Sequence, residues 1–501
     1  ARGLGDVYKR QVLNGGIFMS EFSEILSQHI HNKDIKTYAL AQYCGLDRSN
    51  MYKVINGKRK PTSEAMVDKM CKFMHLSPAE ENELKEAYMI TLTGTDNYYR
   101  RKDVLHFFSE FNLTASDLPI INYRFESISS SEDVILLNTP SEVNRALLSI
   151  VSMDLHKENG HIRMLIQPDN DFLMNVLVAE DSRTPGVCID HLICLNNNAE
   201  ATYSHKNYNL HCLKQVLPLY GSSYEYNCFY YYDNIAFNNN SLILFPYIII
   251  TSEYACLLTS DMTRGYMTRS AASVKMFINI FKEHLSKSSP LLRPINSPFV
   301  QLEYVKDLWR SGSMGYSFQM TPCFTPFITL ELMEKCIKKG IPERELLISS
   351  FHSYIQEMLH DNKYKPVSYI FSYDGVEHFL KTGQIAEYPP QVYVPLEMPD
   401  RILIVKQLLQ ACRTHSYRML KNNVGNMDNE LFLCVNHQKG YLMFATPFNQ
   451  SLVYLDIEES GLLFTFLDFC ENLDSSMFYT KEEAIEKIKF LINVYKEETS
   501  D

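Results

Sequence analysis

The sequence predicts a multi-domain α+β protein, with an all-α head of five short helices followed by a large mixed α/β body. Three observations support this prediction. The chain has 501 residues, which is long enough for several domains. Residues 20–92 carry apolar side chains at the spacing of short helices, and after residue 133 strand-like segments alternate with helix-like ones. Hydrophobic residues at 46% and charged residues at 21% are typical of globular proteins.

Apolar spacing and capping signals define the helices of the head. Phe22, Leu26 and Ile30 recur on one face of the first helix. The last helix opens with Ser77 at the N-cap position and Pro78 at the first helical position, and acidic residues follow in its first turn. We therefore expect helices over residues 22–30, 36–43 and 48–55, after Pro61-Thr62, and from Ser77-Pro78 onward.

In the body, alternating strands and helices favour an α/β layer arrangement. We expect strands at 133–138, 161–167, 187–195, 224–232, 242–250 and 254–259, and helices at 140–156, 170–179, 207–219 and 269–285. The breaker-rich stretch 286–298 predicts a boundary. Beyond it we expect helices at 329–360, 400–412, 461–473 and 480–495, and strands at 430–436, 441–446 and 452–456. No internal repeat is recognisable in the sequence.

These patterns divide the chain into five parts. Residues 1–18 are similar to translated vector sequence, so we expect a non-native leader with Met19 as a plausible start. The helical head follows at 19–92, and a connector containing an amphipathic helix at 101–111 follows at 93–120. The body is then expected to comprise an α/β effector domain at 121–290 and a second mixed α/β region at 299–496.

The segment "TYALAQYCGLDRSNMYKVIN" (37–56) predicts two helices joined by a tight turn. Ala41 is small where the two helices approach closely. Gly45 lies at the turn, where a positive φ is easily adopted only by glycine. Asp47 can cap the second helix by accepting a hydrogen bond from its backbone. Three apolar residues then pin the second helix to the core: Leu46, Met51 and Val54.

This segment resembles the lambda-repressor/Cro-like (Xre-type) helix-turn-helix domains of bacterial transcription regulators. The resemblance covers residues 20–90 and extends to the loop "INGKRKPT" (55–62). Met51 and Tyr38 are less usual choices at their positions in this family. The residues that carry the match are Ala41, Gly45, Leu46, Met51 and Val54.

The resemblance implies a DNA-binding domain whose second motif helix lies in the major groove of double-stranded DNA, in a protein that acts as a homodimer. Contacts to base edges are then expected from Arg48, Ser49, Tyr52, Lys53 and Asn56. Contacts to phosphates are expected from Thr37, Lys53, Lys58, Arg59 and Lys60. Arg48 has the geometry to bind guanine with two hydrogen bonds.

The charge distribution is consistent with a local DNA contact. Residues 48–60 hold five basic residues and no acidic one, although the whole chain has a net charge of −11. Residues 19–92 are neutral overall, residues 1–18 carry +2, and the remainder carries −13. A body of this charge repels a polyanion. The alternative is that residues 48–60 are merely a solvated polar face with a charged loop.

The body carries no motif that indicates catalysis. We find no phosphate-binding loop, no G-x-S-x-G and no H-E-x-x-H. A phospholipase-D-like body would need paired H-x-K-x4-D motifs, but the only H-x-K of the body is His437–Lys439, with Phe444 where Asp is required. We therefore expect no enzymatic activity and no cofactor. The body is expected to bind an unknown small-molecule or peptide effector, or to form the dimer.

Two other patterns leave alternatives open. Cys188, His191 and Cys194 are residue types that bind zinc, but residues three apart on a strand point to opposite faces, which favours buried strand positions. The aromatic stretch "YEYNCFYYYD" (224–233) fits either a sheet face or a ligand pocket. A protein-interaction role for the head and an enzyme fused to it remain the two rival functions.

The compartment expected from the sequence is the cytoplasm. The twelve cysteines form no C-x-x-C pair, which is typical of a reducing environment. The longest apolar run, "LILFPYIII" (242–250), contains Pro246 and is far shorter than the ~20 residues of a membrane helix. No membrane contact is expected.

Overall fold

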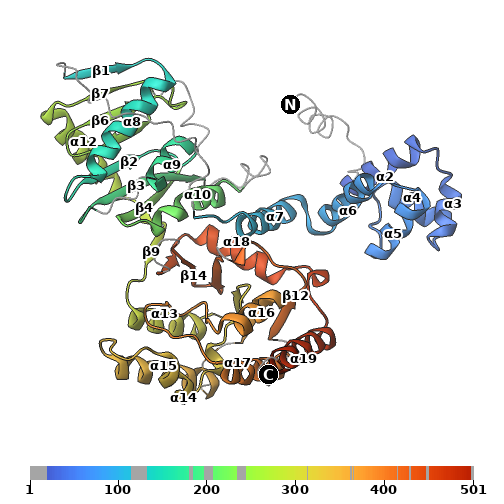
Figure 1. The fold of residues 1–501 in the computed structure, drawn as a ribbon. Coiled ribbons are helices and arrows are strands. Elements are labelled where there is room, and N and C mark those ends of the chain that lie inside the picture. Colours follow the sequence, from blue (N-terminus) through green and yellow to red (C-terminus); the bar gives the residue numbers. More distant parts are fainter. Residues whose placement is uncertain are drawn as a thin grey trace. The chain divides into compact units, whose positions relative to one another are not determined.

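The computed structural model describes residues 20–113, 133–179, 184–196, 207–233, 244–312, 314–360, 364, 366–413, 416–427, 430–446 and 451–497. The predicted leader, 1–18, lies outside these residues, as does the end of the predicted connector. The chain forms two compact units that meet in sequence at Lys102 and Asp103 (Figure 1). Each unit is considered by itself below. No helix in the described residues combines the length and the apolar character that crossing a membrane requires.

The first unit contains helices at all five predicted places. Their bounds are α2 Glu21–Asn32, α3 Thr37–Tyr43, α4 Arg48–Ile55, α5 Glu64–Phe73 and α6 Pro78–Thr93. Ser77 and Glu80 form the capping box at the start of α6, with Ser77 accepting from the Glu80 amide and Glu80 from the Ser77 amide. The core of this unit comprises buried residues from all five helices, among them Phe22, Leu26, Leu40, Met51, Met70 and Leu84.

The helix expected at 101–111 in the connector starts earlier in the structure and includes most of the segment "TGTDNYY" (93–99). Helix α7 spans Thr95–Ser109 and begins directly after Gly94, whose φ of +85° ends α6. The first turns of α7 are held against α6 by Glu86, which accepts from Tyr98 (3.2 Å) and pairs with Lys102 (2.7 Å). These contacts between helices explain why a polar segment without an apolar stripe is helical, a cause that local sequence does not reveal.

The second unit contains two mixed sheets (Figure 1). The first sheet has the order β1-β7-β6-β5-β2-β3-β4-β8. Its strands are β1 Val134–Leu137, β2 His161–Leu165, β3 Cys188–Asn196, β4 Glu225–Asp233, β5 Tyr247–Ile250, β6 Ala255–Leu258, β7 Gly265–Thr268 and β8 Ser289–Pro290. Its helices are α8 Pro140–Leu155, α9 Asp171–Ala179, α10 Tyr208–Val216 with the 3-10 turn η2 Leu217–Gly221, and α12 Ala271–Leu285. We call residues 133–290 the first lobe.

The second sheet has the order β12-β11-β10-β13-β14-β15-β9. Its strands are β9 Leu292–Pro294, β10 Gly315–Phe318, β11 Val367–Ser372, β12 Tyr417–Leu420, β13 Phe432–Val435, β14 Gly440–Ala445 and β15 Leu452–Ile457. Its helices are α13 Pro298–Arg310, α14 Leu330–Cys336, α15 Arg344–His360, α16 Tyr373–Thr382, α17 Met398–Ala411, α18 Ser460–Glu471 and α19 Lys481–Glu497. The 3-10 turns are η3 Thr325–Phe327 and η5 Ser475–Met477. We call residues 291–497 the second lobe.

The two lobes share one topology, although no repeat is recognisable in their sequences. Each begins with an edge strand (β1, β9) and a helix (α8, α13). Three parallel strands follow in order (β2-β3-β4, β10-β11-β12). An antiparallel meander then starts beside the first parallel strand and ends on the edge strand (β5-β6-β7, β13-β14-β15). A helix closes each series (α12, α18).

The segment predicted as a breaker contributes a strand to both sheets. β8 pairs with β4 of the first sheet, and β9 pairs with β15 of the second. The sequence also failed to predict the strands β7, β10, β11 and β12 and the helices α13 and α16. Pro298 was interpreted as part of the breaker, but it occupies the first turn of α13, where proline lacks only an amide that would have no helical partner.

The end of α7 belongs to the core of the second unit. Phe107 and Phe108 are buried, and their rings lie 5.6 and 6.1 Å from that of Phe466 on α18. Asp103 accepts a hydrogen bond from the Asn207 amide at the start of α10 (2.9 Å). The last part of α7 therefore contacts both the first and the second lobe.

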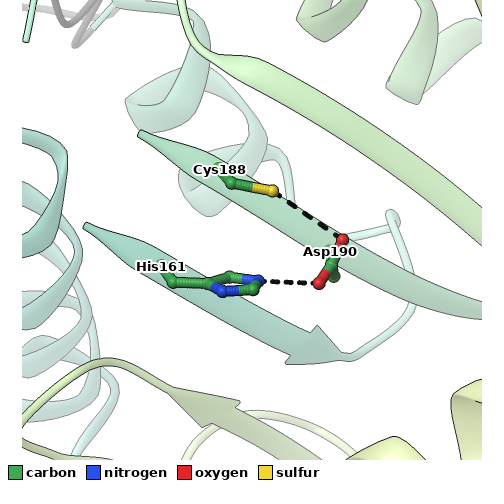
Figure 2. Close-up of side chains that lie close together, drawn as sticks. All are labelled: His161, Cys188 and Asp190. Atoms are coloured by element: carbon green, nitrogen blue, oxygen red, sulfur yellow. Dashed lines mark hydrogen bonds and ion pairs between the residues drawn. The ribbon is translucent and has the colours of Figure 1, made fainter. Parts of the chain in front are cut away.

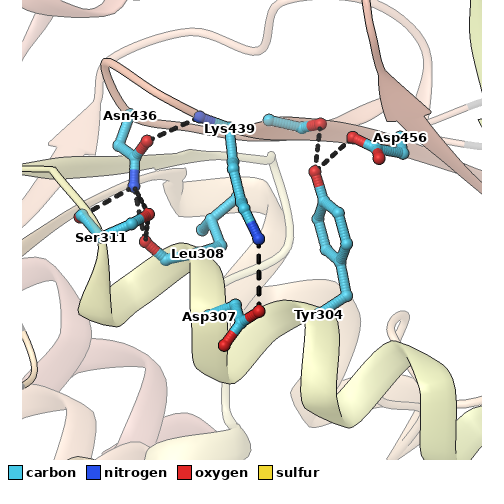
Figure 3. A network of polar contacts seen from close by, with 8 residues as sticks. Tyr304, Asp307, Leu308, Ser311, Asn436, Lys439 and Asp456 are labelled. Atoms are coloured by element: carbon cyan, nitrogen blue, oxygen red, sulfur yellow. Dashed lines mark hydrogen bonds and ion pairs between the residues drawn. The ribbon is translucent and has the colours of Figure 1, made fainter.

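Helix α13 is fixed to the β13–β14 turn by a polar network (Figure 3). The buried Asn436 donates to the carbonyls of Leu308 (2.5 Å) and Ser311 (3.2 Å), and its own Oδ1 accepts from the amide of Lys439 (2.9 Å). The Lys439 ammonium lies 3.3 Å from Asp307, and the Tyr304 hydroxyl donates to Asp456. This network positions α13, whose first turns line a cavity described below.

Replacing Asn436 by alanine is expected to lower the free energy of unfolding of the second unit by about 2–4 kcal/mol, because buried carbonyl and amide groups lose their partners. Urea unfolding measures this change. The control is Asn472→Ala, since Asn472 is exposed and bonds mainly to its own helix; its effect should stay within roughly 0.5 kcal/mol. Equal effects of the two substitutions would show that the network is not stabilising.

Candidate nucleic-acid interface

The turn between α3 and α4 has the geometry expected from its sequence. Gly45 adopts a φ of +72°, and the Leu46 amide donates to the Ala41 carbonyl (2.9 Å). Ala41, Met51 and Val54 are buried, at 1%, 0% and 2% exposure. Helix α4 is therefore held against the core along one side, and its opposite side is solvent-exposed.

Capping contacts connect the start of α4 to the basic loop that follows it. Asp47 accepts hydrogen bonds from the amide and the side chain of Asn50, both at 2.7 Å. The side-chain Oδ1 of Asn50 in turn accepts from the Arg59 guanidinium (3.1 Å), and the Arg59 backbone amide donates to the Lys53 carbonyl (3.1 Å). The sequence indicated the Asp47 cap but not the role of Asn50, which depends on how the loop folds back.

The nine residues predicted to contact DNA lie on α3, α4 and the following loop. All are exposed except Thr37, which is half-buried: Thr37, Arg48, Ser49, Tyr52, Lys53, Asn56, Lys58, Arg59 and Lys60. Thr37, Tyr52 and Asn56 line one surface hollow of about 290 Å³. The structure thus brings residues of both helices together at one surface, as a common ligand would require.

Arg48 and Tyr52 form a pair on the exposed side of α4. The Arg48 guanidinium lies 5.6 Å from the centre of the Tyr52 ring. A hydrogen bond from Arg48, together with its charge, lowers the pKa of the Tyr52 hydroxyl, and a hydrogen bond with Thr37 adds to this effect. The pairing limits the side-chain freedom of Arg48, which reduces the entropy lost when this residue binds a partner.

Among the described residues of the first unit, some lysines form ion pairs, whereas Lys36, Lys69, Lys72 and the basic residues of 48–60 do not. Lys33, Lys85 and Lys102 form ion pairs of 2.7–2.9 Å with Glu80, Asp68, Glu81 and Glu86. Within the described residues, none of five cations forms an ion pair: Arg48, Lys53, Lys58, Arg59 and Lys60. These five define the basic segment, a positive surface without neutralising carboxylates.

Cys188, His191 and Cys194 do not form a metal site. His191 is fully buried and bonds to the Tyr226 hydroxyl (2.7 Å) and to the Ile166 carbonyl (3.0 Å). Burial lowers the pKa of His191 to about 4. Cys188 points to the other side of β3, as the alternation of strand side chains predicts.

Cys188 instead lies beside His161 and Asp190, and the potential ligand atoms of these three residues are within 4.8 Å of one another (Figure 2). The surrounding hydrogen bonds oppose metal binding. Arg163 donates to His161 Nδ1 (2.7 Å), so His161 Nε2 carries the proton that is donated to Asp190 (2.7 Å). Burial and the neighbouring Asp190 raise the pKa of Cys188 to about 12, which disfavours the thiolate that a metal needs.

The aromatic stretch on β4 belongs in part to the hydrophobic core. Tyr226 is 3% exposed, and Tyr230 and Tyr232 pack ring to ring at 5.3 Å. The Tyr232 hydroxyl donates to Glu459 at the start of α18. The sheet-face interpretation of this stretch is therefore favoured over the ligand pocket.

No protein-family model matches the sequence, and no curated protein matches it. Three solved structures show low similarity. The archaeal chromatin protein TrmBL2, described with a novel mode of DNA binding, has 10% identity over 49% of this chain and 84% of its own, with a TM-score of 0.20. Phosphatidylserine synthase of Haemophilus influenzae Rd KW20 has 11% identity over 74% and 94%, with a TM-score of 0.22. Polyphosphate kinase of Porphyromonas gingivalis has 11% identity over 72% and 55%, with a TM-score of 0.21. At these TM-scores none of the three carries an argument about this chain.

Proposed function

We propose that the chain is a sequence-specific DNA-binding transcription regulator with a helix-turn-helix head of the Xre type and a body that binds an effector or forms a dimer. The observation that carries this proposal is the basic segment. Its five cations are exposed and free of acidic partners, and they lie on a helix and loop whose other side is fixed to the core. Cations arranged in this way gain DNA-binding free energy from the release of counterions from the phosphates.

In the proposed complex α4 lies in the major groove and the following loop contacts the backbone. Arg48, Ser49, Tyr52, Lys53 and Asn56 face the bases. Lys58, Arg59 and Lys60 contact phosphates, together with Thr37 at the start of α3. A homodimer presents two such heads to half-sites about one helical turn apart.

The first test is selection of a binding site from a random DNA library with the purified full chain, followed by fluorescence anisotropy at several salt concentrations. A regulator should select one sequence and bind it more weakly as salt rises. Selection of no sequence, together with affinity that does not change with salt, would contradict the proposal.

Replacing Arg48 by alanine is expected to relax base preference. Loss of a two-bond contact to guanine should reduce discrimination at one operator position by about 1–3 kcal/mol, while affinity for random DNA changes little. Anisotropy on the selected site and on single-base variants measures this difference. A uniform loss on all sequences would instead assign Arg48 to a phosphate contact.

A second candidate function is docking of a protein partner through the head. It is favoured by Tyr38 and Tyr43 on α3, whose side chains are 66% and 51% exposed. Aromatic residues are common at protein interfaces. Absence of any salt-dependent retention on a heparin or DNA column would favour this function over DNA binding.

We also propose that the body binds and does not catalyse. The only H-x-K of the body is used in structural contacts: His437 lies 3.5 Å from Glu471, and Lys439 belongs to the network that fixes α13. Turnover of a metabolite found bound to the purified protein would overturn this part of the proposal.

A further inference from the structure

The second lobe contains a cavity of about 320 Å³. It lies between α14, α15, the segment from Glu387 to Val392, and β15. Most of its wall is apolar, with Met333, Ile348 and Phe351 as representative contributors. Tyr220 adds a residue from the first lobe. The volume is within the range of small-molecule sites, which are usually about 300–1,000 Å³.

Among the described residues, Glu387 is the one carboxyl group that lines this cavity, and it also lines an adjoining space of about 60 Å³. Oε1 accepts from Gln319 Nε2 (3.1 Å), and Oε2 accepts from Thr325 Oγ1 (2.9 Å) and Cys323 Sγ (3.4 Å). All three donors are uncharged. A carboxylate offers about four acceptor positions, so one remains for a further donor.

No cation of the described residues compensates the charge of Glu387. Neither space is lined by a Lys, Arg or His of that part of the chain, and Glu387 takes part in no ion pair there. Burial raises the pKa of Glu387, while the hydrogen bonds from Cys323, Gln319 and Thr325 act in the opposite direction. Glu387 is half-buried, and a carboxylate shielded from water whose donors are all neutral has no positive charge to balance it.

Aromatic rings that line the cavity are a second feature that favours a cationic ligand. Phe351, Tyr388 and Tyr454 line it, and the first two pack edge to face at 5.6 Å. Aromatic faces attract cations through their quadrupole, most strongly where water is excluded. The Tyr454 hydroxyl is itself engaged with the Glu387 carbonyl (2.9 Å), so this ring is fixed in place.

We propose that this cavity binds a small organic amine, with its ammonium group on Glu387 and its apolar body against the aliphatic and aromatic wall. In the proposed regulator this amine is the effector. Its role as an effector depends on the proposed function, but its binding to the cavity does not. An anionic ligand would meet the Glu387 carboxyl without a compensating cation. A neutral apolar ligand would leave the remaining acceptor position of Glu387 unfilled.

The binding test uses the purified full chain without DNA, so its outcome is independent of whether the head binds DNA. The probes are 2-phenylethylamine, its uncharged analogue 2-phenylethanol and the anion 3-phenylpropionate, titrated by ligand-detected NMR. For probes of this size a dissociation constant on the order of 1 mM is expected for the amine. A hydrogen bond to a charged group makes the amine bind about tenfold or more tightly than the alcohol.

The variant Glu387→Gln should lower the affinity for the amine to that of the alcohol and leave the affinity for the alcohol unchanged. The matched control is Glu334→Gln, which makes the same substitution at an exposed position of α14. Circular dichroism confirms that both variants are folded. A second variant, Val392→Phe, fills the cavity and should abolish binding of the amine and of the alcohol alike.

Three results would overturn the inference: no binding of the amine at concentrations of about ten times the expected constant, equal affinity for all three probes, or unchanged affinity for the amine in Glu387→Gln. Addition of the amine to the DNA-binding assay then shows whether it is an effector. Binding of the amine by a chain that does not bind DNA would refute the proposed function and leave the amine site standing.

Discussion

Replacement of Lys58, Arg59 and Lys60 together by alanine is expected to weaken DNA binding on the order of 10- to 100-fold and to reduce the steepness of its salt dependence. Each cation that contacts a phosphate releases about 0.9 counterion, so the slope of log affinity against log salt should fall by about 2.7. The effect should be similar on operator and random DNA, because phosphates carry no sequence information. Fluorescence anisotropy at salt concentrations from about 50 to 200 mM measures both quantities.

The control removes the same charge from the body. Lys275 and Lys282 on α12 and Lys287 just after it are exposed and form no ion pair in the described residues. Their triple replacement by alanine should leave affinity and slope unchanged if DNA contacts the basic segment. If both triple variants lose affinity equally, net charge alone governs binding and the local interface is wrong.

The stability of the second unit is expected to fall as pH rises from about 4.5 to about 8, because of Glu430. Burial raises the pKa of Glu430 to about 8 from an ordinary value of 4.5, and hydrogen bonds from the amide and hydroxyl of Thr321, both 2.9 Å, only partly oppose this rise. Glu387 adds a smaller effect in the same direction as burial. The folded chain therefore holds a proton that the unfolded chain releases within this pH window.

The direction in which stability changes with pH follows from proton linkage. A group with a raised pKa in the folded state favours folding below its unfolded pKa, and this contribution is lost as pH approaches the folded pKa. The slope is at most about 1.4 kcal/mol per pH unit for one group. Urea unfolding at pH 5, 6, 7 and 8 measures it, and Glu430→Gln should flatten the profile relative to the parent. The exposed control is Glu334→Gln. If both substitutions change the dependence of the unfolding free energy on pH equally, Glu430 is not its cause.

Local signals predicted the helices of the first unit well. The bounds expected for the helix after Asp47 agree with α4, because the cap, the glycine and the apolar spacing all lie within a few residues of one another. The exposure of the nine predicted contact residues follows from the same spacing. Their role in DNA binding stays a prediction, since exposure and charge do not identify a ligand.

Features that depend on distant residues were not predicted. Glu387 meets Gln319 and Thr325 across more than sixty residues of sequence, so no local pattern reveals the cavity carboxyl. The shared topology of the lobes also leaves no visible repeat. A strand requires suitable apolar and β-branched positions but not particular residues. For example, β2 ("HIRML") and β10 ("GYSF") occupy equivalent positions in their sheets but have no residue type in common.

The pairing of β8 with β4 and of β9 with β15 also has a consequence for biosynthesis. Once the ribosome has made Pro290, all the strands of the first sheet have been synthesised. Strand β9, in contrast, cannot pair until its partner β15, which ends at Ile457, has been synthesised. At ordinary elongation rates this interval lasts roughly 10–30 s. Phe107 lacks its partner ring for longer still, because Phe466 is made after β15. The nascent chain thus carries an uncovered strand edge and an exposed aromatic ring, which makes it a substrate for chaperones until the second lobe closes.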